Sequence, residues 1–353
     1  MLPPGSTIGI LGGGQLGRML ALAAARLGLR CRIYDPDPLA PAGQIAGHEP
    51  AGWDDAAALR RFAEGCDALT YEWENVPPAA LDTVEAVRAL RPSRRAIEVS
   101  ADRLSEKRFL TGLGLGVAPF APVEDALSLD AALGEIGPPA ILKTRRLGYD
   151  GRGQARIAGA EDAAAALAAM AGAPAILEGF VAFTAEISVI AGRAADGATV
   201  AYDPGLNVHE DGILRTTTVP APVPAVVRQD AILAAARILE ALDYVGVIGV
   251  EFFVAPSGLL VNEIAPRVHN SGHWTQAGCA VDQFEQHVRA VAGWPLGDGS
   301  RHADVVMENL IGSDVDRAAA LARDPAVQLH LYGKAETRPG RKMGHANRVR
   351  PLG

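Results

Sequence analysis

The first hundred residues alternate short apolar runs with helical patterns, and this alternation constrains the fold more than any other feature. The apolar runs are TIGIL, CRIYD and ALTYE, and helical patterns cover residues 15–27 and 54–64. Consecutive parallel strands need a crossover connection, so this order predicts a parallel sheet with helices on its faces. Beyond VSADRLSEKRFLTGLG the chain changes to strands with hairpin turns, interrupted by helices near 160–171 and 225–242, which predicts an α+β region.

A glycine-rich turn joins the first predicted strand to the first predicted helix. The segment IGILGGGQLGRML contains Gly12-x-Gly14-x-x-Gly17, and Asp35 ends the next predicted strand. This pattern is typical of a dinucleotide site, where glycines let the backbone approach a phosphate and the acid binds a ribose hydroxyl. A tight strand-to-helix turn also needs glycines, so this segment alone leaves an NAD site and a structural turn equally open.

A basic, glycine-bearing loop lies near the middle of the chain. In LKTRRLGYDGRGQ, Lys143 ends a predicted strand, and glycines follow at positions 148, 151 and 153. Free backbone N–H groups beside a fixed ammonium group favour a polyphosphate, whose charge must be neutralised while water is excluded. An exposed hairpin tip with basic residues is the alternative. The segment does not match the P-loop pattern, which excludes a P-loop ATPase.

Two glutamates are predicted to face each other across a hairpin. The segments GVIGVEFFVA and GLLVNEIA flank the turn APSG, and counting outward from residue 257 pairs Glu251 with Glu263. Like charges directly opposite each other are destabilising, and a divalent cation relieves that repulsion. With a polyphosphate loop in the same chain, Mg²⁺ held by carboxylates and phosphate oxygens is the natural choice. A register shift of one residue would instead put the two carboxylates on opposite faces.

The segment NEIAPRVHNSGHWTQ suggests zinc at first sight, because His269 and His273 lie four residues apart. A helical two-histidine zinc motif carries glutamate after the first histidine and needs a third ligand, whereas HNSGH has asparagine there and a Ser-Gly pair that disfavours a helix. Arg267, His269, Asn270 and His273 are better interpreted as hydrogen-bond donors to an anionic, hydroxyl-rich substrate beside the metal.

The tail LYGKAETRPGRKMGH concentrates basic side chains around a Pro-Gly turn: Lys334, Arg338, Arg341, Lys342 and His345. The whole chain has a net charge of −8, which argues against a nucleic-acid partner because such binding requires broad basic surfaces. In an acidic protein, a local basic cluster indicates a phosphate-monoester site. A solvated basic surface is the alternative.

The remaining features indicate the compartment. The three cysteines, Cys31, Cys66 and Cys279, lie far apart without a CxxC pair, so neither a disulfide framework nor a cysteine zinc site is expected. The start MLPPGSTIGILGGG lacks the basic and long apolar regions of a signal peptide, and the alanine-rich segment near residue 165 is interrupted by charge, glycine and proline. We therefore expect a cytoplasmic protein with no membrane segment.

These segments together resemble the ATP-grasp superfamily and, within it, the N5-carboxyaminoimidazole ribonucleotide synthetases of purine biosynthesis. The resemblance spans almost the whole chain and rests on GILGGGQLGRML, YEWENVP, ADRLSEK, GYDGRGQ, NVHEDGILRTT, VNEIAPRVHNSGHWTQ and RPGRKMGH. It implies an N-terminal Rossmann-like pre-ATP-grasp domain over residues 1–102 and an ATP-grasp domain over residues 103–295. A mobile lid subdomain is expected at about 127–186, and a short C-terminal subdomain over residues 296–353.

The resemblance also implies the reaction and its ligands. ATP and Mg²⁺ would support phosphorylation of bicarbonate to carboxyphosphate, which delivers CO₂ to the exocyclic amine of aminoimidazole ribonucleotide. The products would be N5-carboxyaminoimidazole ribonucleotide, ADP and phosphate. A homodimer is expected from the family. In this family the N-terminal glycine motif does not serve NAD, and we hypothesise that it approaches the substrate phosphate.

Site residues carry over position by position. Those expected at ATP are Arg103, Lys143, Gly148, Tyr149, Asp150, Gly151, Arg152, Gly153, Gln154, Glu178, Gly179, Phe180, Val181, Glu186, His209, Asn262 and Glu263. Those expected at Mg²⁺ are Glu251 and Glu263. Those expected at the ribonucleotide and bicarbonate are Tyr149, Arg152, Arg267, His269, Asn270, Lys334, Arg341 and Lys342. Those expected to be catalytic are Lys143, Tyr149, Arg152 and Arg267.

Three other functions are compatible with parts of the sequence. An NAD-dependent oxidoreductase would rest on the glycine motif alone. Another ATP-grasp ligase, such as the formate-dependent glycinamide ribonucleotide transformylase, would share the lysine loop and the paired glutamates. A non-catalytic nucleotide sensor is disfavoured, because both glutamates and Lys143 are present.

Overall fold

The computed structural model describes residues 1–148 and 153–352, so Tyr149, Asp150, Gly151 and Arg152 lie outside the described residues. The N-terminal region forms the predicted parallel sheet, in the order β3-β2-β1-β4. Its strands are β1 (Thr7–Leu11), β2 (Arg30–Tyr34), β3 (Gly47–Glu49) and β4 (Ala68–Tyr71), and its helices are α1 (Gln15–Arg26), α2 (Ala56–Glu64) and α3 (Pro78–Glu85). The predicted helix at 54–64 begins at Ala56 because the Asp55 side chain accepts the Ala58 N–H as an N-cap.

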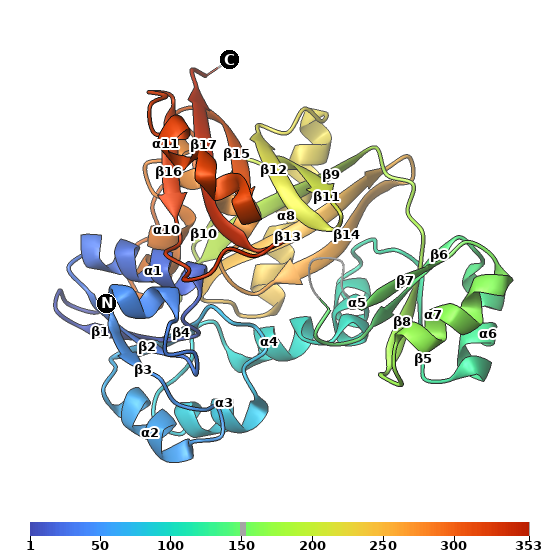
Figure 1. Ribbon diagram of the computed structural model, residues 1–353, viewed down its shortest axis with the longest axis horizontal. Coiled ribbons are helices and arrows are strands. Elements are labelled where there is room, and N and C mark those ends of the chain that lie inside the picture. The colour runs from blue at the N-terminus through green and yellow to red at the C-terminus, as the bar shows by residue number, and fades with distance from the viewer. Residues whose placement is uncertain (149–152, 353) are drawn as a thin grey trace.

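A large antiparallel sheet forms the body of the molecule, in the order β14-β13-β9-β11-β12-β15-β17-β16 with β10 beside β9. Its strands are β9 (Ala185–Arg193), β10 (Thr199–Ala201), β11 (Gly205–Glu210), β12 (Ile213–Val219), β13 (Gly246–Ala255), β14 (Gly258–Ala265), β15 (Asp304–Ile311), β16 (Val327–Leu331) and β17 (Lys342–Arg350). Because β15 pairs with β12, the C-terminal strands extend the same sheet, as Figure 1 shows at its upper left.

Helices cover both faces of the large sheet. Along β9, Val189 and Ala191 pack in the cluster that contains α8 (Ala225–Ala241), whereas Ile190 packs in the cluster that contains α10 (Gln283–Ala292). Successive strand residues point to opposite faces, so α8 and α10 lie on opposite sides of the sheet. The predicted helix at 225–242 is therefore confirmed as α8. Short helices α9 (Thr275–Gly278) and α11 (Ala318–Leu321) come after β14 and β15, respectively.

A smaller antiparallel sheet, which we call the lid sheet, stands at the opposite end of the molecule from β1–β4 (Figure 1). Its strand order is β5-β8-β6-β7. Its strands are β5 (Phe120–Val123), β6 (Ala140–Thr144), β7 (Gln154–Ile157) and β8 (Ala175–Gly179). Helices α6 (Ala126–Ile136) and α7 (Ala163–Ala169) pack against it. Helices α4 (Arg94–Ser100) and α5 (Arg103–Gly112) precede it in the chain. The lid sheet has its own hydrophobic core, which includes Leu129, Leu142 and Leu177.

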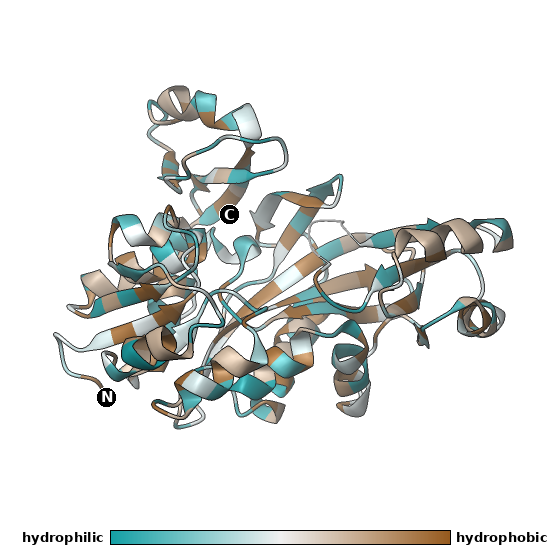
Figure 2. Cartoon of the chain, turned by 60° about the horizontal axis from the view of Figure 1, so that its bottom comes forward, coloured by the Kyte–Doolittle hydropathy of each residue, from teal (hydrophilic) through white to brown (hydrophobic). Residues whose placement is uncertain are grey.

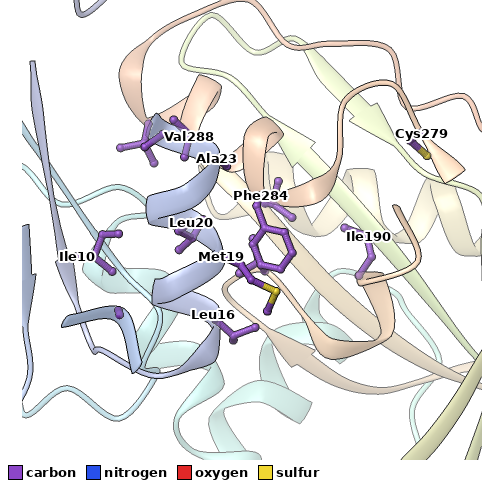
Figure 3. Packing of buried hydrophobic residues seen from close by; sticks show 14 of the residues in the cluster. Ile10, Leu16, Met19, Leu20, Ala23, Ile190, Cys279, Phe284 and Val288 are labelled. Carbon is purple, nitrogen blue, oxygen red and sulfur yellow. The ribbon is translucent and has the colours of Figure 1, made fainter. Parts of the chain in front are cut away.

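The N-terminal sheet is held against the large sheet by a shared core. Met19 and Leu20 of α1 pack in one cluster with Phe284 and Val288 of α10 (Figure 3). Figure 2 shows hydrophobic residues along the central strands, where this core lies, while the helices carry both hydrophobic and hydrophilic positions. Burial of this apolar surface stabilises the relative placement of the two regions.

In the part of the chain that the structure describes, helices fall short of the length and apolar character that a membrane span requires.

Candidate active site

Glu251 and Glu263 are direct partners across the β13–β14 hairpin, as the sequence predicts. Burial and the neighbouring Glu263 carboxylate raise the pKa of Glu251 to about 8, which is the repulsion that a cation would relieve. The pairing nevertheless depends on a β-bulge, because Phe252 pairs with Val261 and the register shifts between Glu251 and Phe252. If the register of Phe252 with Val261 continued without the bulge, Asn262 rather than Glu263 would lie opposite Glu251.

Cationic side chains contact Glu178 of the lid sheet and Glu263 of the carboxylate pair. Lys143 Nζ lies 2.8 Å from Glu178 Oε2, and Lys107 Nζ lies 3.7 Å from the same oxygen. Burial alone would raise the pKa of Glu178, but the two lysines hold it at about 2. Arg103 Nη1 lies 3.6 Å from Glu263 Oε2. Lys107 is absent from the sequence-based site, although it ends the ADRLSEK motif.

The strand end at Glu178 continues into an aromatic, polar region. Gly179 ends β8, and Phe180 is partly exposed, with the guanidinium of Arg156 4.9 Å from its ring centroid. The Phe183 and Phe253 rings stack at 4.8 Å. Apolar rings beside a strand end suit a flat heterocycle.

Glu186 and His209 form an ion pair close to Glu251 and Glu263. His209 Nδ1 lies 2.9 Å from Glu186 Oε2. Burial would lower the pKa of His209, but the hydrogen bond to Glu186 and the charge of Glu251 raise it. The two strands β9 and β11 thus bring a paired carboxylate and imidazole to the carboxylate pair.

The loop after β14 places the predicted substrate residues next to the carboxylates. Arg267 Nε lies 2.8 Å from Glu74 Oε2, so this loop joins the N-terminal region at the YEWENVP motif. His269 Nε2 lies 3.8 Å from Glu251 Oε1, and its Nδ1 lies 2.8 Å from Ser271 Oγ. Burial and the charge of Arg267 lower the pKa of His269 well below its usual value, so the imidazole is neutral at pH 7.

His273 and His345 do not belong to a ligand site, and their interpretation as substrate or phosphate donors is wrong. Both side chains are fully buried, and their ring centroids lie 4.6 Å apart. His345 Nδ1 is hydrogen-bonded to Tyr332 and its Nε2 to Gln276, while Gln283 Nε2 lies 3.0 Å from His273 Nδ1. These contacts are internal to the protein, and periodicity along the sequence could not distinguish them from contacts to a ligand.

The basic tail lies beside the N-terminal region. Lys334 Nζ donates to the Lys342 carbonyl at 2.8 Å, and Gln44 donates to the carbonyl of Gly333. Arg341 Nη1 donates to the Glu336 carbonyl at 3.0 Å. The loop between β16 and β17 therefore holds Lys334, Arg341 and Lys342 close together, next to the segment Pro41–Gln44 that follows β2.

Carboxylates of the protein itself bind the glycine turn. Gly13 N–H donates to Asp35 Oδ2, and Gly14 N–H donates to Glu72 Oε1, both at 2.7 Å. In a dinucleotide site, Asp35 would bind a ribose hydroxyl, but here its carboxylate accepts the Gly13 N–H. Two N–H groups of the turn are thus occupied by internal anions, which favours the structural interpretation of this motif over an NAD site.

Comparison with known proteins decides the family. Models of the ATP-grasp domain, the ribonucleotide synthetase preATP-grasp domain and the phosphoribosylaminoimidazole carboxylase C-terminal domain match residues 108–284, 5–101 and 305–351. The chain is 53% identical to the N5-carboxyaminoimidazole ribonucleotide synthase of Brucella melitensis, over 99% of this chain and 98% of that one. The chain belongs to the N5-carboxyaminoimidazole ribonucleotide synthase family.

Solved structures of N5-carboxyaminoimidazole ribonucleotide synthases agree with this assignment. The Thermus thermophilus synthetase is 47% identical with a TM-score of 0.91, covering 97% of this chain and 93% of that one. The Aspergillus clavatus synthase in complex with ADP and 5-aminoimidazole ribonucleotide is 32% identical with a TM-score of 0.92, covering 99% and 94%. These matches confirm the predicted family, the predicted fold class and the predicted enzyme class, an ATP-grasp ligase.

Proposed function

We propose that the chain catalyses ATP-dependent carboxylation of 5-aminoimidazole ribonucleotide with bicarbonate, in the de novo purine pathway that leads to IMP. The main support for this proposal is that a carboxylate, Glu263, and a guanidinium, Arg267, lie on β14 and on the loop that follows it. Glu263 of β14 faces Glu251, and Arg267, four residues later, contacts Glu74 of the N-terminal region. A phosphoryl donor and a ribonucleotide acceptor would therefore meet over this segment. The A. clavatus relative contains ADP and 5-aminoimidazole ribonucleotide together.

ATP would bind between the lid sheet and the large sheet. Lys143 and Arg103 supply positive charge for its phosphates, together with the loop from Gly148 through residues 149–152 to Gly153 and Gln154. Residues 178–181 would contact adenine, and Glu186, His209 and Asn262 would complete the nucleotide site. Glu178 Oε1 supports this assignment, because it is buried with no hydrogen-bond partner among the described residues, and a buried acceptor needs a donor.

Mg²⁺ would be held by Glu251 and Glu263. The pair fits a hard divalent cation, since the carboxylates are partners on adjacent strands and the pKa of Glu251 is raised by burial and by Glu263. When bound, the ion neutralises charge on the phosphate oxygens of ATP.

The remaining residues would position the acceptors. Arg267, His269, Asn270 and the tail residues Lys334, Arg341 and Lys342 would bind the ribonucleotide and bicarbonate, together with Tyr149 and Arg152, which lie outside the described residues. Arg267 presents a fixed guanidinium, because Glu74 holds its Nε. Such a group suits an anion such as bicarbonate or carboxyphosphate.

The chemistry requires two transfers. The γ-phosphoryl group of ATP moves to a bicarbonate oxygen, which forms carboxyphosphate and releases ADP. The exocyclic amine of the ribonucleotide then bonds to the carboxyl carbon as phosphate leaves, and the amine loses a proton. Lys143, Arg103 and Arg267 would neutralise the moving charges, and burial of the site would exclude water, which hydrolyses carboxyphosphate.

Several coarser features complete the proposal. The boundary after residue 102 and a lid near 127–186 are supported by the separate N-terminal and lid sheets, although β5 places the start of the lid sheet at Phe120. The boundary after residue 295 is supported by the match of a C-terminal domain model to residues 305–351, while β15, β16 and β17 continue the large sheet. A cytoplasmic homodimer accords with the family. The contact of Gln44 with Gly333 brings the basic tail close to the N-terminal region. The hypothesis that the glycine turn approaches the substrate phosphate is nevertheless disfavoured at Gly13 and Gly14, whose N–H groups already donate to the Asp35 and Glu72 carboxylates.

The test is ADP release measured with MgATP, bicarbonate and 5-aminoimidazole ribonucleotide, omitting each in turn. We expect ADP only when all three are present. ADP formation that ignores the ribonucleotide, or that requires formate, would overturn the proposal and favour another ATP-grasp ligase. A fluorescence titration that shows tight NADH binding and no MgATP binding would favour an oxidoreductase.

A further inference from the structure

Strand β14, which carries Glu263, lies at the edge of the large sheet. An edge strand presents backbone N–H and C=O groups that the sheet does not pair, and these need other partners when buried. Here the outer edge is covered from outside the sheet. The Val261 N–H donates to the Gly116 carbonyl at 2.8 Å, and helix α5 supplies the partners further along.

One face of α5 contacts three consecutive residues of β14. Residues three and four apart on a helix share a face, and Arg103, Glu106 and Lys107 have this spacing. Lys107 Nζ donates to the Asn262 carbonyl at 2.6 Å, Arg103 lies 3.6 Å from the Glu263 carboxylate, and the Ile264 N–H donates to Glu106. The helix thus fixes the strand on both sides of the Glu263 side chain.

The contact of Lys107 falls on the bulge residue itself. Asn262 is the extra residue that moves Glu263 into register with Glu251. A bulge leaves its extra residue outside the regular ladder and re-aims the neighbouring side chain. A buried carbonyl at such a position is costly without a donor, and Lys107, 1% exposed, supplies that donor.

Lys107 has a second contact, with the lid sheet. Its Nζ lies 3.7 Å from Glu178 Oε2, the oxygen that also accepts from Lys143. One ammonium group therefore joins the last residues of β8, where adenine is proposed to bind, to the bulge that places a proposed metal carboxylate. Arg108, the next residue of α5, is exposed to solvent and so does not share the buried position of Lys107.

We propose that Lys107 is a positioning residue of the ATP site: it holds the Asn262 bulge, so that Glu263 faces Glu251, and it couples this register to Glu178. The inference rests on the proposed function, because the register matters through Mg²⁺ and ATP. It assigns Lys107 no contact with the ribonucleotide.

The test compares three variants. Lys107→Met removes both contacts with a side chain of similar length, whereas Lys107→Gln keeps a donor for the Asn262 carbonyl. Arg108→Met is the matched control. Binding of ATP is measured by calorimetry at a series of Mg²⁺ concentrations, without ribonucleotide or bicarbonate. Circular dichroism and thermal unfolding check the fold, and steady-state kinetics separate the KM for ATP from the KM for 5-aminoimidazole ribonucleotide.

We expect the Mg²⁺ concentration for half-maximal ATP binding to rise about 10-fold or more in Lys107→Met, as for other residues that orient metal ligands. Lys107→Gln should show a smaller rise, Arg108→Met none, and the KM for the ribonucleotide should stay unchanged in all three. A Mg²⁺ dependence in folded Lys107→Met identical to that of the unmodified protein, or equal losses for ATP and ribonucleotide in either Lys107 variant, would overturn the inference. Absence of Mg²⁺-dependent ATP binding by the unmodified protein would overturn the proposed function itself and this inference with it.

Discussion

The side-chain amides of Asn270 and Asn309 bind each other in both directions. Asn270 Nδ2 donates to Asn309 Oδ1 at 2.9 Å, and Asn309 Nδ2 donates back to Asn270 Oδ1 at 2.8 Å. Asn309 is fully buried on β15 and also donates to the Leu214 carbonyl. The orientation of Asn270, a predicted substrate residue, is therefore set by a strand of the C-terminal segment.

Replacing Asn309 by alanine should weaken ribonucleotide binding without affecting ATP. The Asn270 amide would lose its partner and with it a fixed orientation, a loss of about 1–3 kcal/mol. We expect the KM for 5-aminoimidazole ribonucleotide to rise about 10-fold and the KM for ATP to stay the same, as steady-state kinetics can measure. Asn347→Ala is the matched control, because Asn347 is equally buried on β17 but donates to the His273 carbonyl. An equal rise in both variants would indicate general destabilisation instead.

Glu263→Gln should abolish turnover while leaving the fold intact. The substitution keeps the shape of the side chain and removes a charge from the proposed Mg²⁺ site, so we expect kcat to fall on the order of 100-fold or more. Because it also removes a like-charge pair, Tm should stay the same or rise. ADP release and thermal unfolding measure the two effects. Near-normal activity would remove the metal role, and exposed Glu240→Gln serves as the control.

The sequence predicts the strands and pairings well where local patterns determine them. The β13 and β14 boundaries and the Glu251–Glu263 pairing follow from the apolar runs and the turn between them. Counting from residue 257 gives this pairing, but the hairpin turn pairs Ala255 with Gly258, which alone would place Asn262 opposite Glu251. The bulge that corrects the register contacts Lys107 of α5. This contact joins distant segments, so no local sequence pattern contains it.

The same reason explains the residues that sequence reasoning missed or misassigned. Lys107 and Asn309 are buried side chains whose partners lie 155 and 39 residues away, so only the folded chain brings them into the site. His273 and His345 resemble site residues by spacing and composition, yet both are part of the core. Burial, which decides between the two interpretations, depends on tertiary packing rather than on periodicity.

The stability contributed by Glu178 should depend on pH in a defined window. Although burial opposes it, Lys143 and Lys107 lower the pKa of Glu178 from its unfolded value of 4.5 to about 2. The native state therefore binds this proton more weakly than the unfolded state, so the contribution is complete above about pH 4.5 and is lost as pH falls toward 2. The difference in Tm between the unmodified protein and Glu178→Gln should shrink between about pH 5 and about pH 3. A constant difference across this range would contradict the charged pairing.

Two glycine-to-alanine substitutions should have opposite effects on stability. Alanine favours a helix over glycine by about 1 kcal/mol, so Gly134→Ala in α6, where a new Cβ meets nothing within 4 Å, should raise Tm. Gly17→Ala in α1 should lower Tm, because its Cβ would lie 2.9 Å from the Gly12 carbonyl oxygen. Since both positions are helical, the contrast isolates the close approach of α1 to the turn before it, and thermal unfolding measures it directly. A rise in Tm for Gly17→Ala would show that the turn relaxes, and that the glycine there is not required by packing.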